Sequence, residues 1–344
     1  MSIRRSTALV LLLALFAGLF AGCSDANGAV TMLSVDGTDV YADEFIYYYN
    51  TMLASFQNTF GAENFNTMMQ NAEFAETMEN SLKTSATNQC AMRITLTNAA
   101  KDLGISLSSE DQKTLEANKK ETISNLGGTA AYENYLKETG ISDRLFDMVN
   151  EFSMLYNKIF DSFYGESGSR TLTKDQLKTY FTENYLTANH ILKLTVDPST
   201  GAALPDEQVA AAKEKIDEIL AQIRGGADFD TLVETESEDT GKTTNPGGYT
   251  FTQGDMTAEF YEAALALSEG EISDVVQSSL GYHIIKRLPL DMEYFDENLS
   301  ALSDSYYEAD FYAYITSLTS AADIQYTEDY DNLNSSNLNY YLGK

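Results

Sequence analysis

Apolar residues recur at steps of three and four along most of residues 41–185, which predicts a series of amphipathic helices. Asn and Gly residues separate the apolar stripes, as at Asn125-Leu126-Gly127-Gly128, and indicate where one helix ends before the next. The two clearest stripes are Phe45, Tyr48, Tyr49, Met52 and Phe56, and Leu145, Met148, Val149, Phe152, Leu155, Tyr156 and Ile159.

Two shorter signals frame this helical region. Weak alternation from Thr31 to Val40, with Asp36-Gly37 in the middle, predicts a small hairpin. Thr173 and Gln176 have the spacing of a capping box, so a further helix should begin there and carry Leu177, Tyr180, Phe181 and Tyr185.

The pattern changes between residues 186 and 289, which contain all four Pro and both His of the chain. Strand-like runs open and close this segment at His190–Leu194 and Tyr282–Ile285, and a helical stripe from Val209 to Ile223 lies between them. Helical spacing returns after Pro289, and residues 323–326 could add a short strand. A helical head, an inserted α/β unit and a helical tail suggest that head and tail pack together.

The first 22 residues have the pattern of an export signal, with two Arg followed by an apolar run from Ala8 to Phe20 that is too short to span a membrane comfortably. Small residues just before Cys23 resemble a bacterial lipobox. The resemblance implies cleavage before Cys23 and a diacylglycerol on its sulfur, with residues 23–30 as a tether. The alternative is an ordinary signal peptide with an incidental Cys.

The strongly acidic charge balance disfavours some classes of partner. The chain of 344 residues has 22 Lys and Arg against 52 Asp and Glu, a formal net charge of −30, which disfavours a nucleic-acid partner. Such a charge repels anionic lipid headgroups, so the lipid would have to provide the membrane anchor.

Cofactor and metal chemistry find little support in the sequence. Two Cys and two His cannot by themselves build a multi-ligand zinc site, and the common nucleotide-binding and hydrolase motifs are missing, so we expect no cofactor and no metal. The acidic run Glu234–Asp239 is interpreted as a solvated face, with a loose calcium site as the alternative. Cys90 lies in a helical pattern and should be a buried small hydrophobe rather than a reactive thiol.

The chemistry concentrates on the two histidines. His190 and His283 each stand in an apolar strand pattern, so their imidazoles can approach each other if the strands are neighbours. The alternative is two core histidines without a catalytic role.

Their surroundings resemble the parvulin family of peptidyl-prolyl isomerases over residues 186–289. The matching pieces occur in order along the segment: Ala188-Asn189-His190-Ile191-Leu192, Gly225-Gly226-Ala227-Asp228-Phe229, Ser237-Glu238-Asp239, Gly247-Gly248, Met256-x-x-x-Phe260, Leu267-x-x-Gly270-Glu271-Ile272-Ser273 and Gly281-Tyr282-His283-Ile284-Ile285-Lys286.

This resemblance implies roles for seven residues. His190, Asp239, His283 and Ser278 would form the catalytic hydrogen-bond network, in which Asp239 could orient a histidine. Met256 and Phe260, with Phe251 beside them, would form the apolar cup for the proline ring. The segment after Gly248 departs from the family pattern, because it is two residues shorter and lacks the apolar Leu that often forms a wall of the cup.

The whole arrangement resembles foldase lipoproteins of the PrsA kind and, more distantly, the SurA and trigger-factor chaperones. We therefore expect an α+β multidomain protein, in which N- and C-terminal helical segments form one chaperone domain around an inserted parvulin-like domain with a small antiparallel sheet and surrounding helices. The expected parts are a signal peptide (1–22), a tether (23–30), the N-terminal helical domain (31–185), the parvulin-like domain (186–289), a C-terminal helical part packing on the N-terminal domain (290–330) and a flexible tail (331–344).

The resemblance also implies a function. The expected activity is peptidyl-prolyl isomerisation combined with chaperoning of secreted proteins that contain X-Pro bonds, at the extracytoplasmic face of the cell membrane. Two alternatives stay open: a holdase whose parvulin-like domain is inactive, and, less favoured, a solute-binding lipoprotein. The oligomeric state is open, a homodimer included.

Overall fold

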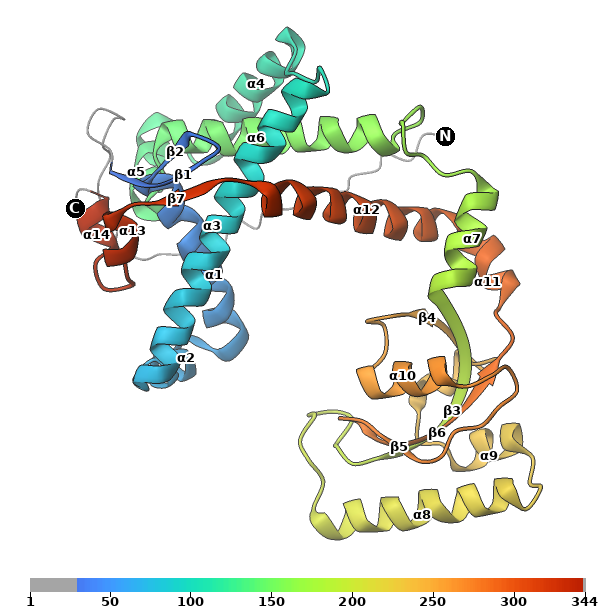
Figure 1. Cartoon of the computed structure of the whole chain (residues 1–344). Helices are drawn as coiled ribbons and strands as arrows, with labels where there is room; N and C mark the ends of the chain where they lie inside the picture. The colour runs from blue at the N-terminus through green and yellow to red at the C-terminus, as the bar shows by residue number, and fades with distance from the viewer. Residues whose placement is uncertain (1–29, 343–344) are drawn as a thin grey trace. The chain divides into compact units, whose positions relative to one another are not determined.

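The computed structural model describes residues 30–342 and divides the chain into two compact units (Figure 1). Unit 1 consists of Met1–Thr171 and Ala309–Lys344, and unit 2 is Leu172–Glu308. The predicted signal peptide, Cys23 and nearly all of the tether lie outside the described residues.

Unit 1 is mainly helical, as the three- and four-residue spacing predicted. Its elements are β1 (Thr31–Val35), β2 (Thr38–Tyr41), α1 (Ala42–Phe60), α2 (Ala62–Met68), α3 (Ala72–Asp102), α4 (Ser109–Asn125), α5 (Thr129–Thr139), α6 (Asp143–Tyr164), β7 (Ile324–Tyr326), α13 (Glu328–Asn332) and α14 (Leu338–Tyr341). Helix α12 (Leu299–Ala321) begins in unit 2 and ends in unit 1.

The predicted hairpin is present and joins the two ends of the chain. Asp36 and Gly37 have φ angles of 49° and 74°, the left-handed pair that a tight two-residue hairpin turn needs. Strand β1 pairs antiparallel with β2 on one side and with β7 on the other. Sequence-distant segments thus share one small sheet, and the C-terminal part of the chain packs on the N-terminal part within unit 1.

The core of unit 1 lies between this sheet and helices α1 and α3. Fully buried residues such as Phe45, Tyr49 and Leu82 form it, and Cys90, with 0% of its surface exposed, lies among them. The prediction that Cys90 acts as a buried hydrophobe is therefore confirmed. A buried ion pair crosses the same interface, where Arg93 Nε donates to Glu44 Oε1 over 2.5 Å.

The expectation of a loose tail is wrong for residues 331–342. Leu333, Leu338, Tyr341 and Leu342 are buried in the core of unit 1, with α13 and α14 around them. Lys83 Nζ holds the segment from α3 by donating to the carbonyl oxygens of Tyr330 and Asp331, at 2.9 and 3.1 Å. The Asn- and Ser-rich composition conceals these apolar contacts.

Unit 2 contains the predicted α/β segment. Its elements are α7 (Lys174–Asn184), β3 (Tyr185–Leu194), α8 (Asp206–Arg224), α9 (Phe229–Glu236), the short helix η1 (Thr240–Thr243), β4 (Tyr249–Thr252), α10 (Ala258–Ala266), β5 (Val276–Gln277), β6 (Gly281–Leu288) and α11 (Met292–Glu297). The predicted capping box of Thr173 and Gln176 begins α7.

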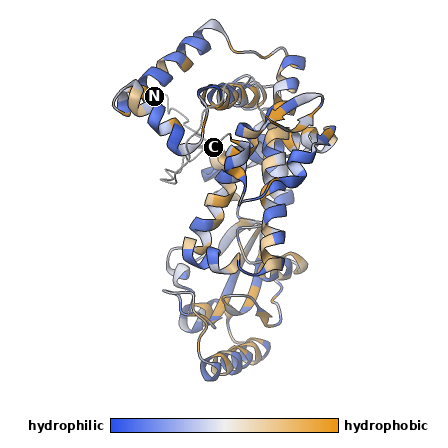
Figure 2. Ribbon diagram, turned by 90° about the vertical axis from the view of Figure 1, so that its left-hand side faces the viewer, coloured by the Kyte–Doolittle hydropathy of each residue, from blue (hydrophilic) through white to orange (hydrophobic). Residues whose placement is uncertain are grey.

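Four antiparallel strands in the order β4-β3-β6-β5 form the sheet of unit 2. Ile191 and Ile284 point to one face, where α8 and α9 cover them. Ala188 and Ile285 point to the other face, where α10 packs (Figure 1). Figure 2 shows hydrophilic and hydrophobic residues alternating along α8, at the bottom of the view, as expected for a helix with one face on a sheet. The fold is therefore mainly helical, with one small antiparallel sheet domain.

The unit boundaries differ from the predicted ones of 186 and 289. Phe295 of α11 and Leu302 of α12 pack on Leu177 and Phe181 of α7, so residues 172–185 and 290–308 belong to unit 2. Only the part of 290–330 from residue 309 onward is in unit 1. The spacing of apolar residues shows that a helix has a buried face but does not identify the partner of that face. No helix in the described part of the chain is long and apolar enough to cross a membrane.

Candidate active site

The register of the unit 2 sheet brings the two histidines together. His190 on β3 pairs with Ile285 of β6, and His283 pairs with Leu192. Paired and alternate residues share one face, so both imidazoles lie on the α10 face, diagonal to each other. Their ring centroids are 5.4 Å apart, and only 8% of His190 and 3% of His283 is exposed.

Helix α10 places an aromatic side chain against both imidazoles. The Phe260 ring lies edge-on to His190 at 5.2 Å and to His283 at 5.4 Å between centroids. Phe251 of β4 packs on Phe260 at 5.7 Å and is 1% exposed, so it supports the Phe260 ring from within the core. Met256, just before α10, is only partly buried against the same cluster.

Asp239 reaches the histidines from the loop after α9. Its Oδ1 accepts a hydrogen bond from the backbone N of Gly241 at 2.9 Å, which begins η1. Its Oδ2 accepts a 2.6 Å hydrogen bond from the hydroxyl of Tyr249 and lies 3.7 Å from His190 Nε2. The carboxylate is thus bound to Tyr249 and is an electrostatic neighbour of His190, without a hydrogen bond to it.

The Asp239 loop is fixed by two further side chains. Ser237 Oγ accepts hydrogen bonds from the backbone N of Leu192 and of Asp239, at 3.1 and 3.3 Å. Lys242 Nζ donates to three carbonyl oxygens at the end of α9, those of Val233, Glu234 and Ser237. The ammonium group thus caps carbonyls at the C-terminal end of α9 and ties the loop to this helix.

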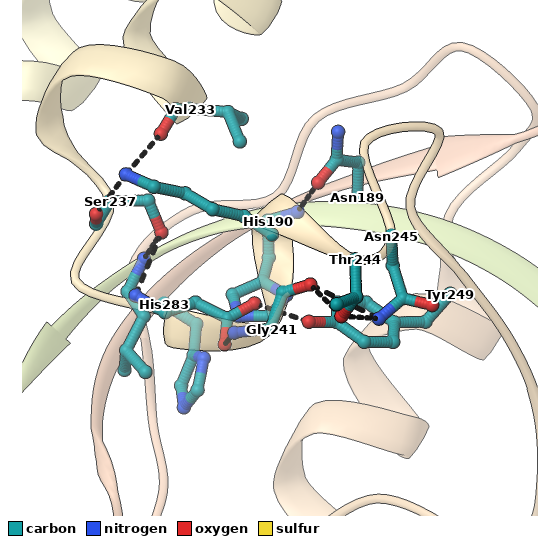
Figure 3. A network of polar contacts seen from close by, with 12 residues as sticks. Asn189, His190, Val233, Ser237, Gly241, Thr244, Asn245, Tyr249 and His283 are labelled. Carbon is teal, nitrogen blue, oxygen red and sulfur yellow. Dashed lines mark hydrogen bonds and ion pairs between the residues drawn. The ribbon is translucent and has the colours of Figure 1, made fainter. Parts of the chain in front are cut away.

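A ring of hydrogen bonds among Gly241, Thr244 and Asn245 closes the rest of this loop (Figure 3). Thr244 Oγ1 and Asn245 Nδ2 both donate to the carbonyl of Gly241, at 3.0 and 3.1 Å. Figure 3 shows Tyr249 on the strand beside this ring. The loop is therefore held both to α9 and across its own turn, which fixes where Asp239 stands.

His283 has its own polar partner. Its Nε2 lies 2.7 Å from Ser278 Oγ, which also accepts a 3.1 Å hydrogen bond from the backbone N of Leu280. Ser278 is 8% exposed, so this pair is shielded from water. The Nδ1 atoms of both histidines are buried and find no hydrogen-bond partner among the described residues.

Burial sets the protonation of the site. Desolvation lowers the pKa of His190, an effect that the nearby Asp239 carboxylate opposes. Desolvation, reinforced by His190, lowers the pKa of His283 to about 4. Both imidazoles are consequently neutral near pH 7. The pKa of Tyr249 is raised by burial and by its hydrogen bond to Asp239, so its hydroxyl keeps its proton.

The structure places every residue predicted for the site in one region of unit 2. His190, Asp239, His283 and Ser278 form the polar part, and Phe260, Phe251 and Met256 belong to the adjacent apolar cluster. Sequence reasoning missed Tyr249 and Lys242, which both act on the Asp239 loop. The signal for Tyr249 was its place directly after Gly248, where the segment departs from the parvulin pattern.

The acidic run before Asp239 serves another purpose. Lys193 Nζ lies 3.8 Å from Glu236 Oε2 and 3.3 Å from Glu238 Oε1, and Lys215 also pairs with Glu236. These carboxylates neutralise lysines of β3 and α8. Within residues 30–342, no group of three or more His, Cys, Asp or Glu side chains is arranged to hold a metal ion.

Comparison with known protein families agrees with this geometry. Residues 190–288 match the model of the PPIC-type PPIase domain, and residues 2–160 match that of the SurA-like N-terminal domain. Unit 2 thus contains a parvulin-type domain of the peptidyl-prolyl isomerase class.

The curated relatives that this chain matches are foldase proteins named PrsA. The chain is 49% identical over 76 residues to Foldase protein PrsA of Oceanobacillus iheyensis, covering 22% of this chain and 25% of that protein. It is 38% identical over 120 residues to Foldase protein PrsA of Geobacillus kaustophilus, covering 33% and 36%. The matches span between a quarter and about a third of the length of these two curated relatives. A crystal structure of PrsA from Bacillus cereus aligns over 92% of this chain and 99% of that chain, with 18% identity and a TM-score of 0.38.

Proposed function

We propose that this protein is a membrane-anchored extracytoplasmic foldase that isomerises X-Pro peptide bonds in unit 2 and chaperones secreted clients with unit 1. The observation that carries the proposal is the pair of buried neutral imidazoles beside Phe260, with Ser278 and Asp239 as their polar neighbours. The PPIC-type match over the same residues supports it.

The reaction needs no covalent step. Rotation about an amide bond faces a barrier of roughly 18–20 kcal/mol, because resonance is lost when the bond is twisted. A thousandfold acceleration requires the site to bind the twisted amide better than the planar forms by about 4 kcal/mol.

The residues present can supply such a preference. Phe260 and Met256 offer an apolar surface for the proline ring. The Ser278–His283 pair and His190 offer neutral, fixed hydrogen-bonding groups. Fixed dipoles in a shielded site stabilise a charge redistribution more strongly than water does.

Isomerisation can be tested by exchange NMR on a Leu-Pro model peptide. The samples are the full mature chain, His190→Ala, Phe260→Leu and, as a matched control on the same helix, Leu265→Ala, because Leu265 is 55% exposed. We expect faster cis–trans exchange with the wild type and Leu265→Ala, and at least a tenfold loss with the other two. The absence of any acceleration by folded wild type would refute the isomerase.

The membrane location rests on sequence and on relatives. The lipobox-like segment before Cys23 and the similarity to PrsA foldases support a lipid anchor outside the cytoplasm. Detergent phase partitioning after expression with the signal peptide tests it. Wild type should enter the detergent phase, and Cys23→Ser should stay in the aqueous phase. Equal partitioning of the two would exclude the anchor.

A holdase with an inactive parvulin-type domain is the second candidate. The observation in its favour is the segment after Gly248, which is two residues shorter than the parvulin pattern and lacks the apolar Leu that often forms a wall of the cup. The same samples discriminate, since a holdase would suppress aggregation of an unfolded client equally well with and without His190→Ala while accelerating no isomerisation.

A further inference from the structure

Tyr249 contacts both His190 and the carboxylate next to it. Its hydroxyl donates to Asp239 Oδ2 over 2.6 Å, and this same oxygen is the one that lies 3.7 Å from His190 Nε2. The two rings are stacked, with centroids 5.8 Å apart and an interplanar angle of 30°. Tyr249 therefore contacts both partners of the Asp239–His190 pair.

The register of β4 and two neighbouring glycines fix the position of Tyr249. It pairs with Ala188 across the sheet, and Ala188 and His190 are alternate residues on one face of β3. The preceding Gly248 has a φ of 93°, and a Cβ at that position would collide with the carbonyl oxygen of Ala188. A Cβ on Gly241 would collide with the Tyr249 hydroxyl itself. Residues 241 and 248 therefore have to be glycine for the Asp239 loop to pack against the Tyr249 side chain.

The groups that face His190 come from four elements. They are Asp239 from the loop after α9, Tyr249 from β4, Phe260 from α10 and His283 from β6. Asp239 is the one carboxylate among them, whereas His283 is neutral and Tyr249 keeps its proton. Its distance from His190 consequently decides whether the imidazole gains a proton.

We propose that Tyr249 is a positioning residue, whose hydroxyl holds the Asp239 carboxylate 3.7 Å from His190 Nε2, outside hydrogen-bond distance, and so leaves that imidazole available to the peptide. The availability to a peptide rests on the proposed isomerase function. The placement of the carboxylate does not, because it follows from the hydrogen bonds alone. Without the hydroxyl, Asp239 Oδ2 loses its hydrogen bond to Tyr249, and we expect the carboxylate to turn toward His190 Nε2, 3.7 Å away.

The test is NMR titration of the histidines in the full mature chain carrying Tyr249→Phe. The chain has only two His, so two imidazole signals appear, and His283→Gln assigns them. We expect the pKa of His190 to rise by about one pH unit or more, since an opposite charge at hydrogen-bond distance favours the charged form. Tyr261→Phe is the matched control, because Tyr261 packs on Phe251 in the same unit, and it should leave the titration unchanged.

A second variant shows that the effect passes through the carboxylate. Asp239→Asn added to Tyr249→Phe should return the His190 pKa to or below its wild-type value. A His190 titration that Tyr249→Phe leaves within 0.2 pH units of wild type overturns the proposal, as does a rise that survives Asp239→Asn.

Measuring isomerase activity distinguishes a failure of the positioning role of Tyr249 from a failure of the proposed isomerase function. Tyr249→Phe should lose severalfold in kcat/KM at pH 6 and recover most of it at pH 8, where His190 is neutral again, whereas a merely structural defect lowers activity equally at both values. If the titration shifts as expected while wild type accelerates no exchange, the positioning role stands and the isomerase fails. If wild type is active and the titration does not move, the positioning role fails alone.

Discussion

The low pKa of His283 makes the stability of unit 2 depend on pH in a defined window. Its value of about 4, against an ordinary 6.5, means that the unfolded chain binds a proton more readily than the folded one between these values. Stability is therefore complete above pH 6.5 and is lost as the pH falls toward 4. The full difference corresponds to about 3 kcal/mol, of which about 2 kcal/mol is already lost at pH 5.

The substitution His283→Gln removes this titration and keeps a hydrogen-bonding side chain next to Ser278. Many carboxylates also titrate near pH 4–5, so the informative quantity is the difference between wild type and variant at each pH. We expect the stability advantage of wild type over His283→Gln to shrink by about 2 kcal/mol between pH 7.5 and 5.0.

Native-state hydrogen exchange gives this difference for unit 2 alone. Protected amides in the β3–β6 ladder report the opening free energy of its sheet, and amides of α1 and α3 in unit 1 serve as the internal control. Comparing wild type and variant at the same pH cancels the intrinsic pH dependence of exchange. A wild-type advantage that changes by less than about 0.5 kcal/mol over this range would refute the buried, neutral state of His283.

Three further outcomes follow from the structure. Truncation before Leu333 removes three buried leucines and a buried tyrosine. At about 1.5–3 kcal/mol per leucine, denaturant unfolding should show unit 1 destabilised by several kcal/mol. Unchanged stability would contradict the burial of the tail. Arg93→Met leaves the Glu44 carboxylate, 1% exposed, without its partner and should cost about 3–5 kcal/mol near neutral pH. That cost should shrink at acidic pH, where Glu44, whose pKa burial already raises, becomes protonated; a pH-independent loss would point to packing alone. Because the histidines are neutral and the Asp239 carboxylate lies beside them, Glu-Pro peptides should be isomerised severalfold more slowly than Leu-Pro peptides at low salt. Asp239→Asn should reduce that gap, and equal rates for the two peptides would show that Asp239 does not act on the substrate.

The sequence predicted those residues of the site that lie on or next to the two central strands. His190 and His283 lie in continuous apolar runs, and an antiparallel pairing of those runs leaves few ways to arrange the two imidazoles. Ser278 precedes the second run by a short turn, so its contact with His283 is local. Asp239 was placed near the histidines by the order of family motifs and not by any pattern of its own.

The tail shows a different limit of sequence reasoning. Leu333, Leu338, Tyr341 and Leu342 show no helical or strand period, because they lie in or directly after two helices that are too short to display one. What fixes them is the surface of α1 and α3, more than 200 residues away in sequence. Composition alone therefore predicted a loose segment where the structure has part of a core.

Tyr249 shows why the length of a segment can matter more than its residue types. The short stretch after Gly248 was interpreted from sequence as the loss of an apolar wall. In the structure it extends the sheet, with Ala188 opposite Tyr249 and Leu186 opposite Phe251. Side chains alternate between the two faces of a strand, so this register sends Tyr249 and Phe251 to the histidine face and Thr250 to the other. A stretch longer by one residue with the same composition would reverse the assignment and leave the Asp239 carboxylate without its phenol. The register of β4 thus determines which side chain of this strand lies next to His190. A comparison of sequence motifs does not include that register and therefore could not predict the contact.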